Sequence, residues 1–255
     1  MPEVLEVELT RRGMLCLVGE QISRVERTDP LVVAEGVDAM VRGATITGFD
    51  RRGKQLVLVS DGPSVGVHLG MTGRVLLDDV STVGELAYGS RDDRPQWDRW
   101  VLAFRSGRRL RLHDPRRLAR VVLDPDLDRL GPDALTIRRV DLVDALHRRR
   151  APLKAVLLDQ HAIAGLGNMT VDEVLWWAGL DPRRVAGDLT EEQVGNLHAH
   201  LRRRLPVMLR RGGSHTGTLS PSVRMDLDSC PRDGHLLARS VVGGRTTVWC
   251  PHHQR

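Results

Sequence analysis

Pro2 and Glu3, the second and third residues of the chain, are of types that can do covalent chemistry together. Removal of the initiator methionine would give Pro2 a secondary α-amino group, with an ordinary pKa of about 8 against about 10.4 for lysine. Such an amine can attack a sugar C1′ and form an iminium ion that promotes elimination. Glu3 could donate a proton to the ring oxygen and later move protons. Alternatively, both residues simply begin a helix, where proline and glutamate are common.

Four residues near the other end of the chain have the types and spacing of metal ligands. They are Cys230, Asp233, Cys250 and His253. Two residues separate the members of each pair, and sixteen separate the pairs. Thiolate, imidazole and carboxylate all bind zinc, and four such ligands complete a tetrahedral structural site. His235 and His252 are spare candidates, and a metal-free hairpin held by packing is the alternative.

Two turns carry a third group of candidate residues. The segment VHLGMTGRV places His68 and Met71 around glycines, and HDPRRLARV places Arg116 and Leu118 on a second turn. Apolar side chains on loops can wedge into stacked bases, and an arginine can engage the base that loses its partner. For Met71 and Leu118 taken singly, an ordinary core position is the alternative.

Basic residues are abundant, but lysine occurs only at positions 54 and 154. The 38 Lys and Arg residues give a net charge of +5, which is compatible with nucleic-acid binding but also follows from codon bias. Lys54 precedes the strand-like run QLVLV, where its ammonium could meet a phosphate or a carboxylate. The GLGN turn places Asn168 near the start of a helix, whose free N–H groups attract anions.

The elements that must position these residues follow from periodicity and turn signals. Residues 3–19 read as a helix, and short Val/Leu-rich runs from about 20 to 123 predict an antiparallel β domain, a two-layer sandwich flanked by a helix. The runs are ATITGFD, KQLVLVS, SVGVHLGM, GRVLLDD, RWVLAF, RRLRLHD and ARVVLD. LGPDAL reads as a linker, 211–229 as a loop and 230–255 as a β-hairpin. Further helices are predicted over 138–149, 152–160, 169–178 and 190–210.

The fold class is therefore α+β. No stretch approaches the roughly 18–20 uncharged apolar residues of a membrane span, and the N-terminal sequence suits neither a secretion signal nor a transit peptide. We therefore expect a cytoplasmic protein. Trp176 and Trp177 are interpreted as packing residues.

Taken together, the motifs resemble the formamidopyrimidine-DNA glycosylase / endonuclease VIII family. Seven segments match in the family's order across essentially the whole chain. They are PEVLEVELTRRGM, RRGKQLVLV, VHLGMTGRV, HDPRRLARV, LGPDAL, PLKAVLLDQHAIAGLGNMTVDEVLWWAGLDPRR and GGRTTVWCPHHQ. The resemblance implies a β-sandwich catalytic domain (1–129), a helix–two-turns–helix domain (130–220) and a zinc-finger-like β-hairpin (221–255).

The resemblance also implies the activity and the residue roles. It implies a DNA glycosylase with lyase activity on abasic sites, acting as a monomer on double-stranded DNA that contains damaged bases or abasic sites. Pro2 would be the Schiff-base nucleophile and Glu3 the acid/base, with Glu6 and Lys54 supporting them. Zinc would be the bound metal. The implied DNA contacts are His68, Met71, Arg116, Leu118, Lys154, Asn168 and Arg245.

Three departures from the family pattern leave alternatives open. Asp233 and His253 stand where the pattern has cysteines, Leu118 stands where the purine-specific branch has an aromatic wedge, and the segment from Gly213 to Cys230 is short. The damaged base that is removed therefore stays open. A catalytically silent protein that binds lesions or bent DNA, and a lyase confined to abasic sites, are the competing functions.

Overall fold

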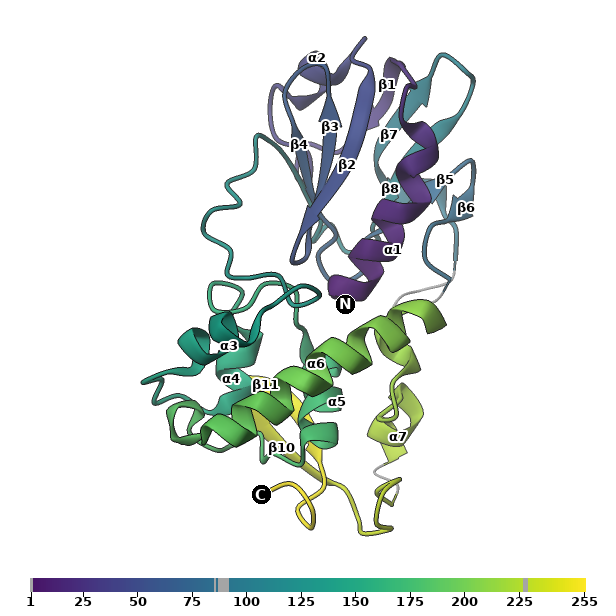
Figure 1. The fold of residues 1–255 in the computed structure, drawn as a ribbon. Helices are drawn as coiled ribbons and strands as arrows, with labels where there is room; N and C mark the ends of the chain where they lie inside the picture. The colour runs from purple at the N-terminus through teal and green to yellow at the C-terminus, as the bar shows by residue number, and fades with distance from the viewer. Residues whose placement is uncertain (1, 85, 87–91, 227–228) are drawn as a thin grey trace. The chain divides into compact units, whose positions relative to one another are not determined.

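The chain forms two units, residues 1–127 and 128–255, in the computed structural model, which describes residues 2–84, 86, 92–226 and 229–255. Each unit is considered by itself (Figure 1). The α+β class predicted from the sequence is confirmed, because strands dominate the first unit and helices the second. The division into three domains stays a prediction.

The first unit is a sandwich of two antiparallel sheets with helix α1 beside them (Figure 1). Its helical segments are α1 (Val4–Met14), the 3-10 turn η1 (Leu15–Leu17), α2 (Val37–Val41) and η2 (Pro95–Trp97). One sheet has the order β1-β7-β8-β5-β6 and the other the order β2-β3-β4-β9. Their bounds are β1 (Ile22–Thr28), β2 (Ile46–Arg52), β3 (Gln55–Ser60), β4 (Val65–His68), β5 (Arg74–Leu77), β6 (Val80–Ser81), β7 (Asp98–Phe104), β8 (Arg109–His113) and β9 (Arg120–Leu123).

The core of this unit lies between the sheets and is built mainly from Val and Leu. All seven residues of β7 are buried, and Trp100, Leu102 and Phe104, which share one face of the strand, belong to the core between the sheets. Helix α1 packs against β2, β3 and β5. Seven of the predicted strand segments are confirmed, whereas β1 was missed because it alternates weakly and only Ile22 is fully buried.

The second unit is helical and ends in a two-stranded hairpin. Its elements are α3 (Arg139–Leu146), α4 (Leu153–Leu158), α5 (Asn168–Ala178), η3 (Ala186–Asp188), α6 (Glu191–Arg211), η4 (Ser214–Thr216), α7 (Pro221–Asp226), β10 (Ala238–Val242) and β11 (Arg245–Trp249). The four predicted helices and the hairpin are confirmed. The prediction that 211–229 is all loop was wrong, because η4 and α7 lie within it. Trp176, with 2% exposure, packs with the hairpin as predicted.

Candidate functional site

The N-terminus of α1 carries Pro2 and Glu3 in buried positions. Glu6, one turn further along the helix, is also buried. The backbone N–H of Glu3 donates to Glu6 Oε2 over 2.7 Å, so the Glu6 carboxylate caps the first turn. The two predicted reactive residues therefore stand together at a helix end whose backbone is fixed by Glu6.

Lys54 lies in the tight turn that joins β2 to β3, after Gly53. Arg51 donates to the Gly53 carbonyl over 2.8 Å and to Glu8 Oε2 of α1 over 3.2 Å. Because one guanidinium bonds both the turn and the helix, it links the segment that carries Lys54 to the helix that carries Pro2.

Glu8 is the centre of this link and is almost fully buried. Burial alone would raise the pKa of its carboxyl group, but hydrogen bonds from Arg11, Arg12 and Arg51 lower that pKa to about 2. Arg11 also donates to the Phe49 carbonyl of β2 over 3.3 Å. Glu8 is therefore ionised at neutral pH and fastens α1 to the second strand.

His68 ends β4 directly opposite Gln55 of β3, so it lies near the Lys54 turn. Burial lowers the pKa of the imidazole, and the charges of Lys54 and Arg120 lower it further. The Gly70 N–H donates to Nδ1 over 3.1 Å. Because Nδ1 accepts that bond, the neutral ring carries its proton on Nε2.

The two predicted DNA-contacting turns pack directly on one another through their backbones. A Cβ atom on Gly70, whose φ is +62°, would lie 2.4 Å from the Leu118 carbonyl oxygen. A Cβ atom on Gly73 would lie 2.3 Å from the Leu69 carbonyl oxygen. Only glycine allows these approaches, so Gly70 is required by the contact with the second turn and Gly73 by the close folding of the first turn on itself.

Asp114 fixes the shape of the second turn from a fully buried position. Its Oδ2 accepts the backbone N–H groups of Leu118 and Ala119 over 2.6 and 2.7 Å. Its Oδ1 accepts the N–H of Arg116 over 3.1 Å and the hydroxyl of Thr72 in the first turn. One carboxylate therefore closes the 114–119 loop and joins it to the neighbouring turn.

The two turns together form one surface, here called the platform, which carries Met71, Arg116 and Leu118. Met71 is 42% exposed and Leu118 37%, so neither side chain is part of the packed core. Arg116 Nη1 lies 3.9 Å from the Met71 sulfur. An ordinary core position for Met71 and Leu118 is therefore excluded, while contact of these three residues with DNA stays a prediction.

In the second unit, Asn168 begins α5 and is half-buried. Gln160 holds the preceding turn, since its Oε1 accepts the Gly165 N–H over 2.9 Å and its Nε2 donates to the Leu166 carbonyl over 3.0 Å. Gly165 has a φ of +108°, which favours glycine, whereas Gly167 has an ordinary extended backbone. Asn168 Oδ1 is buried and has no hydrogen-bond partner among the described residues.

Lys154 and Arg245 occupy opposite environments. Lys154, in α4, is completely buried, with Nζ 2.7 Å from Asp172 Oδ1 and 3.1 Å from the Thr246 carbonyl. Arg245 is exposed and follows the two left-handed glycines, 243 and 244, that turn the hairpin. The exposed Arg245 side chain can therefore reach a phosphate group directly. The Lys154 ammonium is buried, and a direct phosphate contact is not compatible with that position.

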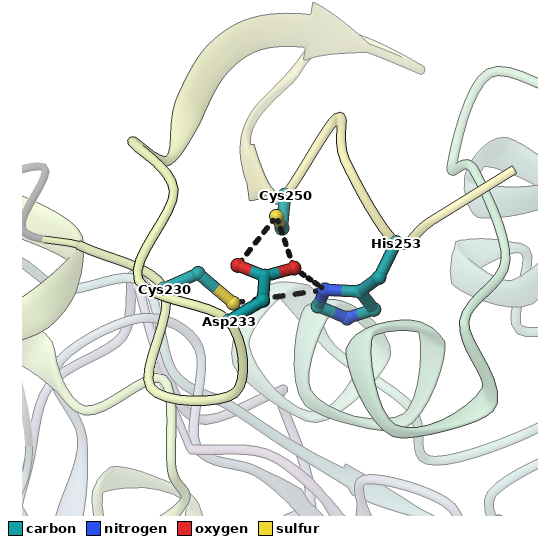
Figure 2. A group of neighbouring side chains, drawn as sticks. All are labelled: Cys230, Asp233, Cys250 and His253. Atoms are coloured by element: carbon teal, nitrogen blue, oxygen red, sulfur yellow. Dashed lines mark hydrogen bonds and ion pairs between the residues drawn. The ribbon is translucent and has the colours of Figure 1, made fainter.

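The four candidate metal ligands converge at the base of the hairpin (Figure 2). The atoms of Cys230, Asp233, Cys250 and His253 lie within 4.8 Å of one another. Cys230 Sγ is 3.6 Å from His253 Nδ1, and Cys250 Sγ is 3.4 Å from Asp233 Oδ2. Tetrahedral zinc with bonds of about 2.0–2.3 Å separates its ligands by about 3.3–3.8 Å. The two sulfur distances fall in that range, whereas His253 Nδ1 and Asp233 Oδ2, at 2.9 Å, lie closer together.

The tautomer of His253 supports a metal site of this kind. Its Nε2 lies 3.2 Å from the Trp176 carbonyl oxygen, which can only accept, so Nε2 carries a proton. The Nδ1 lone pair then points at Asp233 Oδ2, only 2.9 Å away. Two facing acceptors repel unless a cation or a proton lies between them. Orientation of a ligand imidazole by a backbone carbonyl is common in metal sites.

The electrostatics of the other donors follow from the same cluster. Burial acts to raise the pKa of Asp233, but the hydrogen bond from the His235 backbone and, in the metal-free hairpin where Nδ1 holds a proton, the one from His253 outweigh it and hold that pKa well below its usual range. Burial raises the pKa of the Cys250 thiol. Trp176 donates its indole N–H to Cys230 Sγ over 3.3 Å, so that sulfur is oriented as an acceptor.

The spare histidines do not fit the same ion. The rings of His235 and His252 stack at 3.6 Å between centroids with an interplanar angle of 8°. A metal ion lies close to the plane of each imidazole that binds it, and two parallel planes at this separation share no such position. Among the described residues, His253 is the histidine grouped with both cysteines and Asp233 within 4.8 Å, whereas His235 and His252 form a second possible metal group with Asp233.

Comparisons with known proteins address the whole chain. Residues 1–121 match the family model of the formamidopyrimidine-DNA glycosylase N-terminal domain, and residues 130–220 match that of its H2TH domain. A formamidopyrimidine-DNA glycosylase of Moorella thermoacetica is 36% identical over 98% of this chain and 91% of its own length. That of Rhodospirillum rubrum is 35% identical, with full coverage of both chains.

The chain belongs to the formamidopyrimidine-DNA glycosylase family.

Solved structures agree with this assignment. A complex of the Lactococcus lactis Fpg with DNA containing an abasic site matches with a TM-score of 0.83 and 27% identity, over 99% of each chain. Membership makes this chain a base-excision-repair DNA glycosylase with abasic-site lyase activity. Among the residues the structure describes, no helix is long and apolar enough to cross a membrane.

Sequence reasoning missed the buried acids that position this glycosylase's candidate residues. Asp114 sits inside the quoted HDPRR motif, where an Asp-Pro turn was a usable signal because aspartate often accepts backbone N–H groups further along a turn. Asp172 lies four residues after Asn168 in an apolar helix, and a charge in such a position requires a partner. Glu8 offered no signal beyond its i+3 and i+4 arginines.

Proposed function

We propose that this glycosylase excises oxidised bases through a covalent iminium at Pro2 and then cleaves the strand. The observation that carries the proposal is the fixed end of α1, where Pro2 and Glu3 are adjacent and Glu6 caps the helix. The Glu8–Arg51 link holds the Lys54 turn against the same helix.

The chemistry requires one nucleophile and one proton carrier. The Pro2 nitrogen forms a bond to C1′ while the bond from C1′ to the base breaks, and the base departs with the bonding electrons. Protonation of the ring oxygen by Glu3 opens the sugar and leaves an iminium ion. Loss of a C2′ proton then expels the 3′ phosphate, and water hydrolyses the iminium to free Pro2.

DNA engagement divides between the platform and the second unit. Met71 and Leu118 would fill the space left by an everted nucleotide, Arg116 would bond the orphaned base, and His68 would contact the strand. Asn168 and Arg245 would bind phosphates. Structures of the L. lactis relative contain an abasic site, Fapy-dG or an oxidised pyrimidine, and we propose the same lesion classes for this chain.

Borohydride trapping tests the proposal. The wild type, Pro2→Gly and Glu3→Gln are incubated with oligonucleotides that carry formamidopyrimidine, 8-oxoguanine, an oxidised pyrimidine or an abasic site. Glu35→Gln, at an exposed glutamate, is the control. We expect a covalent adduct with the wild type and the control, and a much lower yield with Pro2→Gly, whose primary α-amine can still form a reducible imine, and with Glu3→Gln, which lacks the proton donor.

Each other outcome selects a competing function. Adducts only on abasic DNA would identify a lyase without base release. Tight lesion binding without any adduct would identify a silent binding protein and overturn the proposal. Action as a monomer stays a prediction, which light scattering of the free protein and of the DNA complex would check.

We also propose zinc at the hairpin base, held by Cys230, Asp233, Cys250 and His253. The support is the convergence of four ligand atoms within 4.8 Å of one another and the His253 lone pair that faces Asp233. Bound zinc would cross-link the two ends of the hairpin and thereby stabilise the fold. In the alternative, a metal-free hairpin held by packing, a proton rather than zinc lies between His253 and Asp233.

Metal analysis of protein purified without a polyhistidine tag separates these cases. We expect close to one equivalent of zinc in the wild type, its loss in His253→Ala and its retention in the matched control His252→Ala. Less than about half an equivalent in the wild type would favour the metal-free hairpin. Loss in the control but not in His253→Ala would mean that the ligand assignment is wrong.

A further inference from the structure

A buried ion cluster in the second unit joins three side chains whose roles the proposed chemistry leaves open. Lys154 Nζ and Arg224 Nη1 each lie 2.7 Å from one oxygen of the Asp172 carboxylate. The three residues expose 0%, 4% and 2% of their surfaces, respectively. Such charges are costly to bury, so a paired cluster of this kind adds little net stability but fixes the geometry of the side chains in it.

Two of these side chains also bond the backbone of β11. Lys154 donates to the Thr246 carbonyl over 3.1 Å, and the Val248 N–H donates to Asp172 Oδ2 over 3.1 Å. The strand is thereby held at the two residues that flank the fully buried Thr247. Arg224 brings helix α7 into the cluster. The backbone carbonyl of Arg224 also accepts a hydrogen bond from the side chain of Arg239 in β10.

The tip of the hairpin is held by the same helix that supplies Lys154. A Cβ atom on Gly243, whose φ is +58°, would lie 3.0 Å from the Ala155 Cβ atom. Helix α4 therefore contacts the hairpin at its turn through Ala155 and at its strand through Lys154. Arg245 lies between these two contacts, so its backbone is fixed on both sides.

The cluster also fixes the other candidate phosphate ligand. Asp172 lies one helical turn after Asn168 on α5, and α5 packs against β11 (Figure 1). The carboxylate therefore joins the helix that begins at Asn168 to the strand that begins at Arg245. A change in the cluster would alter the distance between the two groups that would bind phosphate.

We propose that Lys154 is a positioning residue that acts through Asp172 and the Thr246 carbonyl to hold Arg245 in register with Asn168. This rests on the proposed phosphate contacts of Asn168 and Arg245. It replaces the direct phosphate contact that the family resemblance implied for Lys154, because the Lys154 ammonium is enclosed by protein acceptors.

Hydrogen exchange of the free, full-length protein tests the positioning directly. Lys154→Met keeps much of the apolar stem and removes the ammonium. We expect faster exchange of the β11 amides, Val248 above all, in Lys154→Met and in Asp172→Asn, with unchanged exchange in β3 of the first unit. Unchanged β11 exchange in both variants would overturn the proposal. If Lys154→Met fails to fold, Asp172→Asn carries the same test.

A double-mutant cycle on DNA affinity tests how Lys154 acts. If it works through Arg245, Lys154→Met should weaken binding about tenfold in the wild type but less than about twofold in the Arg245→Ala background, since coupled residues are not additive. A direct phosphate contact predicts additive losses. It also predicts that Lys154→Met lowers the salt slope by about 0.9 even without Arg245. Additivity together with that slope change would overturn the proposal.

The same experiments distinguish failure of the proposed phosphate contacts from failure of the positioning role of Lys154. If Arg245→Ala leaves both affinity and salt slope unchanged, the phosphate role of Arg245 is wrong. The exchange of the β11 amides in the free protein still decides whether Lys154 and Asp172 position the strand. Zinc content, measured in every variant, shows whether a change has instead disturbed the hairpin base.

Discussion

Asp114 in the first unit and Asp172 in the second are both buried aspartates, yet they organise their surroundings in opposite ways. Asp114 accepts three backbone N–H groups and one hydroxyl, and most of these donors lie within five residues of it. Asp172 accepts from Lys154, Arg224 and the Val248 N–H, which are 18, 52 and 76 residues away.

The difference separates two ways of placing a functional side chain. Neutral backbone donors around Asp114 set the shape of one loop, and the shape of that loop sets the positions of its exposed side chains. Charged partners around Asp172 join four elements, so the position of a distant strand depends on them. Loss of the first should damage a loop, whereas loss of the second should damage the packing of the unit.

The largest effect is expected for Asp172→Ala. It leaves the Lys154 and Arg224 charges buried without a counterion, which costs about 3–5 kcal/mol of unfolding free energy. Urea denaturation followed by tryptophan fluorescence would measure this loss, because Trp176 and Trp249 report on the hairpin. A loss smaller than that of Asp114→Ala would break the comparison.

Asp114→Ala should cost less, about 2–3 kcal/mol, because the backbone donors that it abandons can partly reach water once the loop opens. The variant should keep a cooperative unfolding transition but lose most lesion binding, since Met71, Arg116 and Leu118 are no longer held together. Affinity for abasic-site DNA and the urea midpoint, measured on the same sample, would check this. Retained lesion affinity would contradict the role of Asp114.

Gly70→Ala tests the backbone contact between the two turns. The positive φ and the 2.4 Å approach to the Leu118 carbonyl together predict a loss of about 2 kcal/mol. Gly107→Ala is the matched control, since Gly107 has a φ of +90° with no neighbour within 4 Å, and it should cost about 1 kcal/mol. Equal losses would mean that the collision with Leu118 has no energetic weight.

Glu8 extends the comparison to a third acid, and its expected effect is confined to low pH. Its folded-state pKa of about 2 lies below its ordinary value of 4.5. The stability it contributes is therefore complete above about pH 4.5 and is lost as the pH falls through about 2. Glu8→Gln should flatten the decline of the urea midpoint across this window, and Glu35→Gln should not. An unchanged decline in Glu8→Gln would refute the link.

The sequence predicted elements best where a period and a turn signal coincide. The run QLVLV and the GG turn of the hairpin are such cases, whereas β1 is an edge strand whose mostly polar residues hide its period. Helix α7 was missed because the surrounding Gly, Ser and Asp residues read as loop. Short helices of this kind are stabilised by tertiary contacts, here the Arg224 ion pair, that composition does not reveal.

The candidate site was predictable in its residue types but not in its supports. Pro2, Glu3, Met71, Arg116 and Leu118 could be named from motifs. The burial of Lys154 could not, because it depends on Asp172 and on a strand more than ninety residues away. Long-range partners of a buried charge are set by the tertiary fold, and a single sequence shows only that such a charge exists.

The platform around Asp114 has a consequence for protein engineering. Its two turns are held by main-chain atoms and glycines, so the identity of the side chains at positions 71, 116 and 118 contributes little to holding it together. Exchange of these three residues should therefore keep the scaffold folded while changing how the protein engages the space and the base left by an everted nucleotide. Libraries varied at these three positions should yield folded proteins whose DNA binding differs from that of the wild type.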